Sequence, residues 1–254
     1  MSDEGHVLSV NVAVPMRNDI KAVGFTGIDK RPTDASVMVR APGPRGQGPG
    51  SGLEGDQVFD SVHHQGDHRA VCVYAREDLD LWEAELGRPL PSGAFGENLT
   101  TAGIDVTGVL LGERWRVGEV LVLEVTQPRN PCVTFHNWMG GRGWLKRFTT
   151  RAVSGCFLRV VEPGEVRAGD VISVVSRPSH DVTVGLAFRA LTRQRELQMR
   201  LVAVDNLTDD IADEAVSSWS ARLPGLHQML EECRSTPRTD VARNDDQEQA
   251  TDVP

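Results

Sequence analysis

The sequence predicts a mainly β protein of the α+β class, in which a β-barrel is followed by a small helical appendage. Short runs of β-branched and apolar residues recur up to about residue 177, and turn residues separate them at short intervals. Only brief helical patterns interrupt these runs. Many short, closely spaced strands are typical of a barrel or a β-rich domain. Beyond residue 181 the apolar residues take helical spacing instead.

Individual elements can be assigned along the barrel portion. The segment 41–52 is rich in glycine and proline and is expected to form a loop. The segment 76–87 places Leu79, Trp82 and Leu86 on one helical face, which predicts a helix. Strands are predicted at residues 7–14, 36–40, 69–75, 156–161 and 170–176, and a hairpin is predicted at 114–127.

The C-terminal third is predicted to hold three helices and a tail. An apolar residue recurs every four positions from Leu207 to Leu223, which indicates one face of a helix. The last twenty residues contain two valines and otherwise little that could be buried, which predicts disorder. We therefore divide the chain into a barrel domain (1–180), a three-helix domain (181–233) and a disordered tail (234–254).

The overall composition excludes several classes of function. Acidic residues outnumber basic ones by 36 to 27, which argues against coating nucleic acid or binding an anionic membrane. No apolar run approaches the roughly 18–20 residues that a membrane span needs. The four cysteines are widely spaced and form no CxxC pair, so they predict no disulfide framework. The start MSDEGH does not resemble a secretory signal, and we expect a soluble cytoplasmic protein.

Cys132 is the strongest candidate for chemistry in this sequence. It ends the run QPRNPC, in which Pro128 and Pro131 stop the preceding strand and would hold the cysteine at the strand end. Arg129 lies three residues earlier and could stabilise a thiolate by its charge. A buried structural cysteine is the alternative interpretation, because free cysteine is often simply part of a core.

A histidine-rich segment precedes the strand at 69–75. His64, His68 and Cys72 are four residues apart and would line up as metal ligands on a helix. The local pattern predicts a turn that enters a strand, and a strand would separate these side chains. His64 beside Gly66 could instead bind an anion or a polar ligand through its side chain and the open backbone. An imidazole on the surface or in the core is the alternative.

Two polar turns could contribute further to a ligand site. In GAFGENLT, Gly96 precedes the polar pair Glu97 and Asn98, which could present backbone N–H groups and an amide to a ligand. Asn98 could equally brace a tight turn. In TGIDKRP, Lys30 and Arg31 could meet a phosphate, although a solvated run of charges has the same appearance.

Taken in order, these motifs resemble the MOSC domain family in its YiiM-like branch. The family name refers to the C-terminal domain of molybdenum cofactor sulfurases. The resemblance covers about residues 7–177, and the segment 182–223 is similar to the three-helix domain that follows in that branch. Its motifs are TGIDKRP (26–32), GLEGD (52–56), HHQGDHRAVCVYAREDL (63–79), GAFGENLT (93–100), LLGERWRVG (110–118), QPRNPC (127–132), GRGWLKRF (141–148) and VEPGEVRAGD (161–170).

The resemblance implies a β-barrel built around a molybdenum cofactor of the molybdopterin type. It implies that Cys132 is the catalytic residue and the molybdenum or sulfur-carrying ligand, and a thiolate is a suitable soft ligand for such a metal. The cofactor-binding residues it implies are Lys30, His64, Gly66, Gly96, Glu97, Asn98 and Arg129. The sequence departs from the family at Gln65, where a second glycine is common, and a side chain there would fill space beside the ligand.

The activity that the resemblance implies is the reduction of N-hydroxylated compounds, including hydroxylaminopurines, at molybdenum. A separate reductase would supply electrons, because the sequence has neither a Rossmann loop for NAD nor a cysteine pattern for an iron–sulfur cluster. Two alternatives stay open: a sulfur carrier with a persulfide on Cys132, and a cofactor-binding module without enzymatic activity. Pyridoxal phosphate binding is a label that applies only to the family at large.

Overall fold

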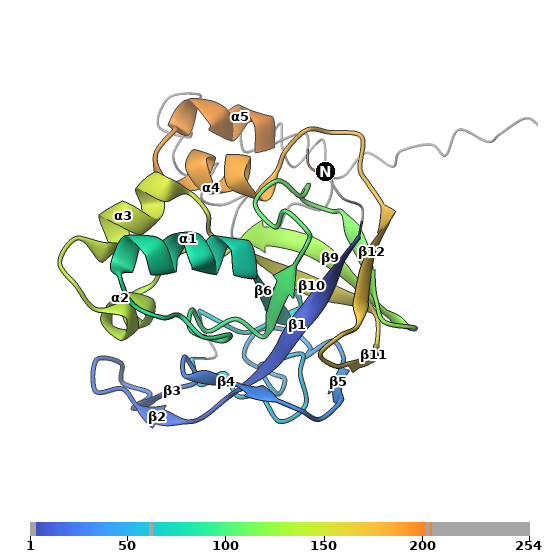
Figure 1. Cartoon of the computed structure of the whole chain (residues 1–254), viewed down its shortest axis with the longest axis horizontal. Helices are drawn as coiled ribbons and strands as arrows, with labels where there is room; N and C mark the ends of the chain where they lie inside the picture. The colour runs from blue at the N-terminus through green and yellow to red at the C-terminus, as the bar shows by residue number, and fades with distance from the viewer. Residues whose placement is uncertain (1–3, 61–62, 202–203, 205–254) are drawn as a thin grey trace, which may run out of the picture. The chain divides into compact units, whose positions relative to one another are not determined.

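Seven strands close into a barrel in the computed structural model, which describes residues 4–60, 63–201 and 204 (Figure 1). The strand order around the barrel is β12-β8-β9-β10-β6-β7-β1, and β12 pairs again with β1. Every pair is antiparallel except β6 with β7. The strands are β1 (Glu4–Ala13), β6 (Val71–Ala75), β7 (Leu99–Ala102), β8 (Arg114–Val117), β9 (Leu121–Pro128), β10 (Cys156–Glu162) and β12 (Val171–Ser176). The predicted mainly β barrel is confirmed.

Short pairs of strands stand outside the ring. Strand β4 (Lys30–Thr33) pairs with the end of β1. Strand β5 (Val37–Val39) pairs with β11 (Gly164–Val166). Strands β2 (Met16–Arg17) and β3 (Phe25–Thr26) form a small hairpin. The start of β4 and this hairpin both contribute residues to the cavity described below.

Three helices lie together beside the barrel (Figure 1). Helix α1 (Arg76–Leu86) was predicted from its apolar face, and it ends at Gly87, whose φ of 64° is a left-handed conformation that glycine adopts without strain. Helices α2 (Val133–Met139) and α3 (Trp144–Arg151) have no counterpart in the sequence prediction. Both are two turns long, and so short a segment gives a weak periodic signal.

An aromatic cluster supports these helices, separately from the aliphatic core of the barrel. Phe95 lies at its centre, with its ring centroid 4.8 Å from that of Tyr74, 5.2 Å from that of Phe135 and 5.8 Å from that of Trp144. These side chains are fully buried or nearly so. Aromatic pairs at such distances add to the hydrophobic free energy of burial. The cluster thereby fixes α2, which Cys132 immediately precedes.

Helix α4 (Val184–Thr192) begins the segment for which three helices were predicted. Thr183 caps it, and its hydroxyl accepts a hydrogen bond from the backbone N–H of Leu186 at 3.1 Å. Phe188 packs edge-on against Phe148, at 5.9 Å between ring centroids. Short helices follow at Arg195–Leu197 (η2) and Gln198–Leu201 (α5). The rest of the predicted three-helix domain and the predicted tail lie outside the described residues, so the domain boundaries stay a prediction.

The described part of the chain contains no helix that is both long and apolar enough to cross a bilayer.

Asp78 in the first turn of α1 is expected to destabilise the protein at neutral pH. Burial, together with the nearby carboxylate of Asp105, raises its pKa to about 6. The folded state therefore holds a proton that the unfolded chain has already lost, and stability falls as the pH rises from about 4 to 6. Asp78→Asn should raise the free energy of unfolding by about 1–2 kcal/mol at neutral pH.

Urea unfolding at neutral and at mildly acidic pH checks this expectation. The gain should shrink as the pH falls towards 4, because the carboxyl of the wild-type protein then becomes neutral as well. Asp80→Asn is the matched control, since Asp80 belongs to the same helix and is exposed, and the loss of its surface ion pair with Arg76 should cost only about 0.2–1 kcal/mol. An Asp78→Asn gain that is independent of pH would contradict the assignment.

Candidate functional site

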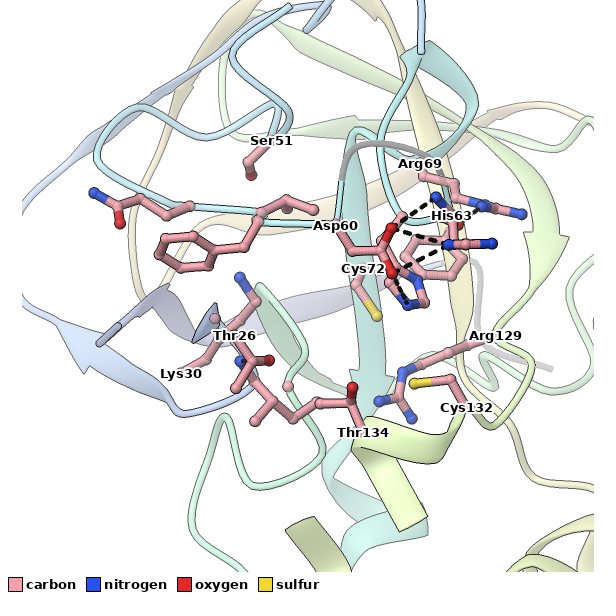
Figure 2. Close-up of a pocket in the computed structure, with 18 of the residues that line it drawn as sticks. Thr26, Lys30, Ser51, Asp60, His63, Arg69, Cys72, Arg129, Cys132 and Thr134 are labelled. Atoms are coloured by element: carbon pink, nitrogen blue, oxygen red, sulfur yellow. Dashed lines mark hydrogen bonds and ion pairs between the residues drawn. The ribbon is translucent and has the colours of Figure 1, made fainter. Parts of the chain in front are cut away.

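One cavity of about 300 Å³ gathers most of the residues that the sequence singles out (Figure 2). Its wall is built from the β2–β3 hairpin, the segment 57–60, β6, the end of β9 and the first turn of α2. Two of the expected site residues, Gly66 and Glu97, are not part of the wall. The expected residues that do line it are Lys30, His64, Gly96, Asn98, Arg129 and Cys132.

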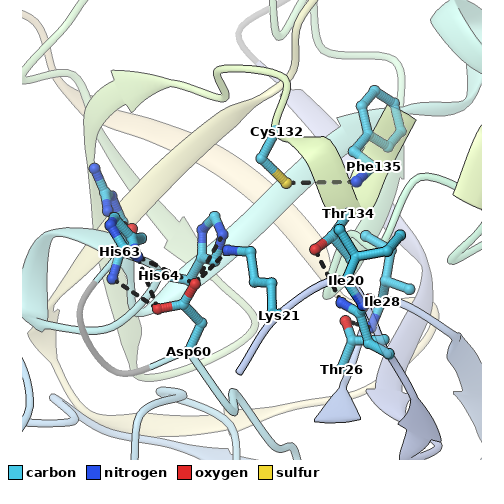
Figure 3. Close-up of polar contacts among 12 residues, drawn as sticks. Ile20, Lys21, Thr26, Ile28, Asp60, His63, His64, Cys132, Thr134 and Phe135 are labelled. Atoms are coloured by element: carbon cyan, nitrogen blue, oxygen red, sulfur yellow. Dashed lines mark hydrogen bonds and ion pairs between the residues drawn. The ribbon is translucent and has the colours of Figure 1, made fainter. Parts of the chain in front are cut away.

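Cys132 is held at the point where β9 gives way to α2. It is the residue before the helix, with an extended backbone, and its Sγ accepts a hydrogen bond from the backbone N–H of Phe135 at 3.4 Å (Figure 3). The side chain is partly exposed and lines the cavity. A sulfur at the start of a helix and open to a cavity is in the setting where reactive thiolates are found.

Arg129 brings a positive charge to the same wall. Its guanidinium carbon lies 4.0 Å from the centre of the Phe135 ring, and the residue is only 6% exposed. Within residues 4–60, 63–201 and 204, its Nη1 has no hydrogen-bond partner. Buried polar groups are nearly always satisfied, so an unpartnered guanidinium nitrogen on a cavity wall indicates a ligand with an anionic or strongly polar group.

Lys30 reaches the cavity as half of a buried ion pair. Its Nζ lies 2.5 and 2.6 Å from the two carboxylate oxygens of Asp56. Burial alone would raise the pKa of Asp56, but the charge of Lys30 and its hydrogen bonds lower it, so this carboxylate is ionised. Sequence reasoning missed Asp56, although it ends the motif GLEGD. The local sequence around Asp56 does not indicate the ion pair, because its partner Lys30 lies 26 residues away in the chain.

The amide of Asn98 is occupied by the protein itself. Its Oδ1 accepts a hydrogen bond from the backbone N–H of Cys72 at 3.1 Å, and its Nδ2 donates to Asp56 at 2.8 Å. Both ends of the amide are therefore used within the protein: Oδ1 joins the turn before β7 to β6, and Nδ2 joins it to Asp56. Of the two alternatives weighed for Asn98, the bracing role is the one that these contacts describe.

Glu97 stabilises the same turn from inside the protein. It is fully buried, and its carboxylate accepts hydrogen bonds from the backbone N–H groups of Gly93 at 2.7 Å and Phe95 at 3.0 Å. Gly96 adopts a φ of 77°, and a Cβ at this position would lie 2.7 Å from Cδ1 of Ile28. Glycine is thus required for the turn, which brings the backbone of residue 96 to the cavity wall.

A second ion pair joins the hairpin to the histidine segment (Figure 3). Lys21, in the turn between β2 and β3, bonds to Asp60, and Nδ1 of His63 lies 3.0 Å from Oδ1 of the same carboxylate. His64 lies on the cavity wall, with its Nε2 4.0 Å from Asp60 Oδ2. Burial, and next the charge of Lys21, lower the pKa of His64 to about 4. The cavity therefore contains a neutral imidazole at physiological pH.

The departure from the family at Gln65 falls beside the cavity and not on its wall. The Gln65 amide donates a hydrogen bond to the carbonyl of Val58 at 2.8 Å. The same side chain occupies the space above Gly50, where a Cβ would lie 2.5 Å from its Nε2. Gly66 has a φ of 108° and approaches Arg45. Gln65 and Gly66 therefore shape the loop beside the cavity and do not form its wall.

The depressed pKa of His64 makes part of the folding stability depend on pH. The unfolded chain binds a proton at this residue between about pH 6.5 and 4, whereas the folded protein does not. Stability is therefore lost as the pH falls through this range. A His64→Gln variant should lose less stability than the wild type between neutral pH and pH values near 4, measured as the shift of the urea midpoint.

His6→Gln provides the control for this prediction, because His6 is exposed on β1. It should follow the wild-type dependence. Equal pH dependence of the wild type and His64→Gln would show that His64 titrates alike in the folded and unfolded states.

Comparisons with known proteins agree with this architecture. Residues 60–173 match the model of the MOSC domain. The chain is 34% identical over 217 residues to the uncharacterized protein YflK of Bacillus subtilis, a match that covers 85% of this chain and 91% of YflK. It is 38% identical over 138 residues to the protein YiiM of Escherichia coli, covering 52% and 60% of the two chains. It is also 32% identical over 178 residues to a protein of Gibberella moniliformis named reductase, covering 66% and 31%.

The fold of this chain is also similar to that of a solved structure. The crystal structure of YiiM from Geobacillus stearothermophilus superposes with a TM-score of 0.66 at 24% identity, over 84% of this chain and 98% of that one. The eight motifs, the closed barrel and the near full-length match to YflK all lead to the same family. The chain belongs to the MOSC domain family, in its YiiM-like branch.

Proposed function

We propose that this protein is an oxidoreductase that reduces N-hydroxylated compounds and that its cavity holds a molybdenum cofactor of the molybdopterin type. The observation that carries the proposal is the pairing, on one cavity wall, of the Cys132 thiol with the unpartnered guanidinium nitrogen of Arg129. Membership of the MOSC family supports the cofactor. The name of the Gibberella moniliformis relative supports reduction as the reaction class.

The residues present fit such a cofactor in three respects. Cys132 offers a soft sulfur ligand, which suits molybdenum. Arg129 has a buried N–H group that is still free for an anionic oxygen. The aromatic rings of Phe25 and Phe59, with centroids 5.8 Å apart, give the same cavity an apolar side against which a flat ring can pack. When bound, the group would supply two-electron redox chemistry at a metal able to take oxygen from an N–OH group.

The protein's own side chains would then bind and orient the substrate. Conversion of R–NHOH to R–NH₂ and water consumes two electrons and two protons, and we propose that a separate reductase supplies the electrons. His64 is neutral at physiological pH and can donate or accept a hydrogen bond at the substrate's hydroxyl. Arg129 favours negative charge beside Cys132, and the apolar side restricts water.

Metal and pterin analysis of the purified protein tests this function. The full-length chain would be expressed in a host that makes the cofactor and then incubated with a hydroxylaminopurine and a reduced dye as electron donor. We expect stoichiometric molybdenum, bound pterin and formation of the aminopurine. A metal-free protein whose Cys132 carries cyanide-releasable sulfur would overturn the proposal in favour of a sulfur carrier. Bound molybdenum without any reduction would favour a non-enzymatic binding module.

A further inference from the structure

Asp56 lies behind the cavity wall and connects several of the groups that form it. Its side chain is fully buried and does not line the cavity. Besides the two contacts with Lys30, its carboxylate accepts hydrogen bonds from the Ser51 hydroxyl at 2.6 Å, from the Asn98 amide at 2.8 Å and from the backbone N–H of Ala13 at 2.8 Å. The four donors come from separate parts of the chain, so this single carboxylate fixes their relative positions.

The two carboxylates Asp60 and Asp56 also determine which cationic side chains of the wall keep a net positive charge for a ligand. Lys21 is paired with Asp60, and Lys30 is paired with Asp56. Arg129 has no ion pair within the described ranges, and its Nη1 has no partner there. A fourth cation of the wall, Arg69, donates a hydrogen bond to the His63 carbonyl. In the part of the wall that the structure describes, Arg129 therefore offers a buried guanidinium nitrogen that the protein leaves without an acceptor.

We propose that Asp56 is a positioning residue that sets the electrostatic potential of the cavity. By cancelling the charge of Lys30, it makes Arg129 the point of attachment for a ligand with a single anionic group. Lys30 keeps a hydrogen-bond donor for a neutral acceptor but attracts no second anion. This inference concerns the protein's own charges and requires no bound cofactor.

Neutralising one member of a buried ion pair should reveal the charge of the other. An uncompensated unit charge in a partly buried site acts over the width of a cavity, because the effective dielectric constant is well below that of water and salt screens poorly there. Asp56→Asn keeps the shape of the side chain and one acceptor oxygen, and it leaves Lys30 as a net positive charge. Lys30→Gln does the reverse and leaves Asp56 as a net negative charge.

The alkylation rate of Cys132 measures this potential directly. Iodoacetate is anionic and iodoacetamide is neutral, so the ratio of their rate constants reports the charge near the thiol, while the neutral reagent corrects for access and thiolate fraction. The probe requires the full-length chain with Cys233→Ser, made in a host that lacks the molybdenum cofactor. Cys72 and Cys156 are buried and should react slowly. Cys132→Ser identifies the labelled site.

We expect Asp56→Asn to raise the iodoacetate-to-iodoacetamide ratio about threefold and Lys30→Gln to lower it about threefold. The double variant Lys30→Gln/Asp56→Asn should return to the wild-type ratio, because the pair is replaced by two neutral groups. Asp29→Asn is the matched control: Asp29 is the neighbour of Lys30 in the chain but pairs with Arg31 outside the cavity wall, so the ratio should not change.

A ratio that stays constant across the set, with only a lower melting temperature for Asp56→Asn, would overturn the proposal and leave Asp56 as a structural brace. If Asp56→Asn does not fold, the comparison of Lys30→Gln with the wild type decides the question: an unchanged ratio overturns the proposal, and a lower ratio supports it. Because the readout needs neither metal nor substrate, it can succeed or fail independently of the proposed reductase activity.

Discussion

A Cys132→Ser variant is expected to lose the molybdenum binding and the N-hydroxy reductase activity proposed above while keeping its fold. Serine is nearly the size of cysteine, but its hydroxyl is a harder and far less acidic ligand. Changes in residues that merely orient metal ligands cost about 10–100-fold in affinity, so loss of the ligand itself should cost more than that. Elemental analysis of the purified variant, beside a dye-coupled reduction assay, measures both losses.

The fold of this variant should be intact because serine suits the position. Cys132 precedes α2 and accepts the hydrogen bond of the Phe135 backbone N–H. Serine is among the preferred residues at such a helix cap, so the free energy of unfolding should be unchanged or slightly higher. Val133→Ser is the matched control, since Val133 is the next residue and is 53% exposed. Full metal content in Cys132→Ser would show that the sulfur is not the ligand.

The barrel could be predicted from the sequence because its strands are regular and separated by clear turn residues. The predicted strand at 69–75 is β6, and the predicted hairpin at 114–127 is β8 and β9 joined through Gly118. Ring closure could not be predicted in this way, because it depends on the pairing of β1 with β12, residues more than 160 positions apart. The resemblance to a known family supplied what local patterns could not.

The sequence predicted several of the residues that line the site, but it did not predict the role of each residue. Cys132, Arg129 and His64 all line one cavity, and sequence reasoning had selected each of them. The polar residues of the GAFGENLT turn appeared equally suited to a ligand, but their side chains bind the protein's own groups: backbone N–H groups for Glu97 and Asn98, and also the Asp56 carboxylate for Asn98. A single sequence does not distinguish a carboxylate that faces a ligand from one that faces buried N–H groups, because both occur beside glycine.

Glu97→Ala is accordingly expected to act on stability and not primarily on the cofactor. The buried carboxylate accepts hydrogen bonds from the backbone N–H groups of Gly93 and Phe95 and from the Thr100 hydroxyl. Alanine would leave two buried N–H groups without an acceptor, at about 1–3 kcal/mol each, together with the hydroxyl. We expect the free energy of unfolding to fall by about 3–5 kcal/mol. Glu97→Gln, which keeps one acceptor oxygen, should lose less.

Urea unfolding and metal analysis of the same preparations separate this role from ligand binding. Glu165→Ala is the control, because Glu165 is exposed on β11 and bonds only to the Ser36 hydroxyl at 2.8 Å among the contacts described for it, so its effect should stay within about 0.5 kcal/mol. If Glu97 held the cofactor, Glu97→Ala would instead keep nearly full stability and lose molybdenum. A strongly destabilised variant whose folded fraction still binds the metal would establish that Glu97 builds the turn behind the cavity wall, because Cys132, the ligand proposed above, precedes α2 and belongs to a separate element.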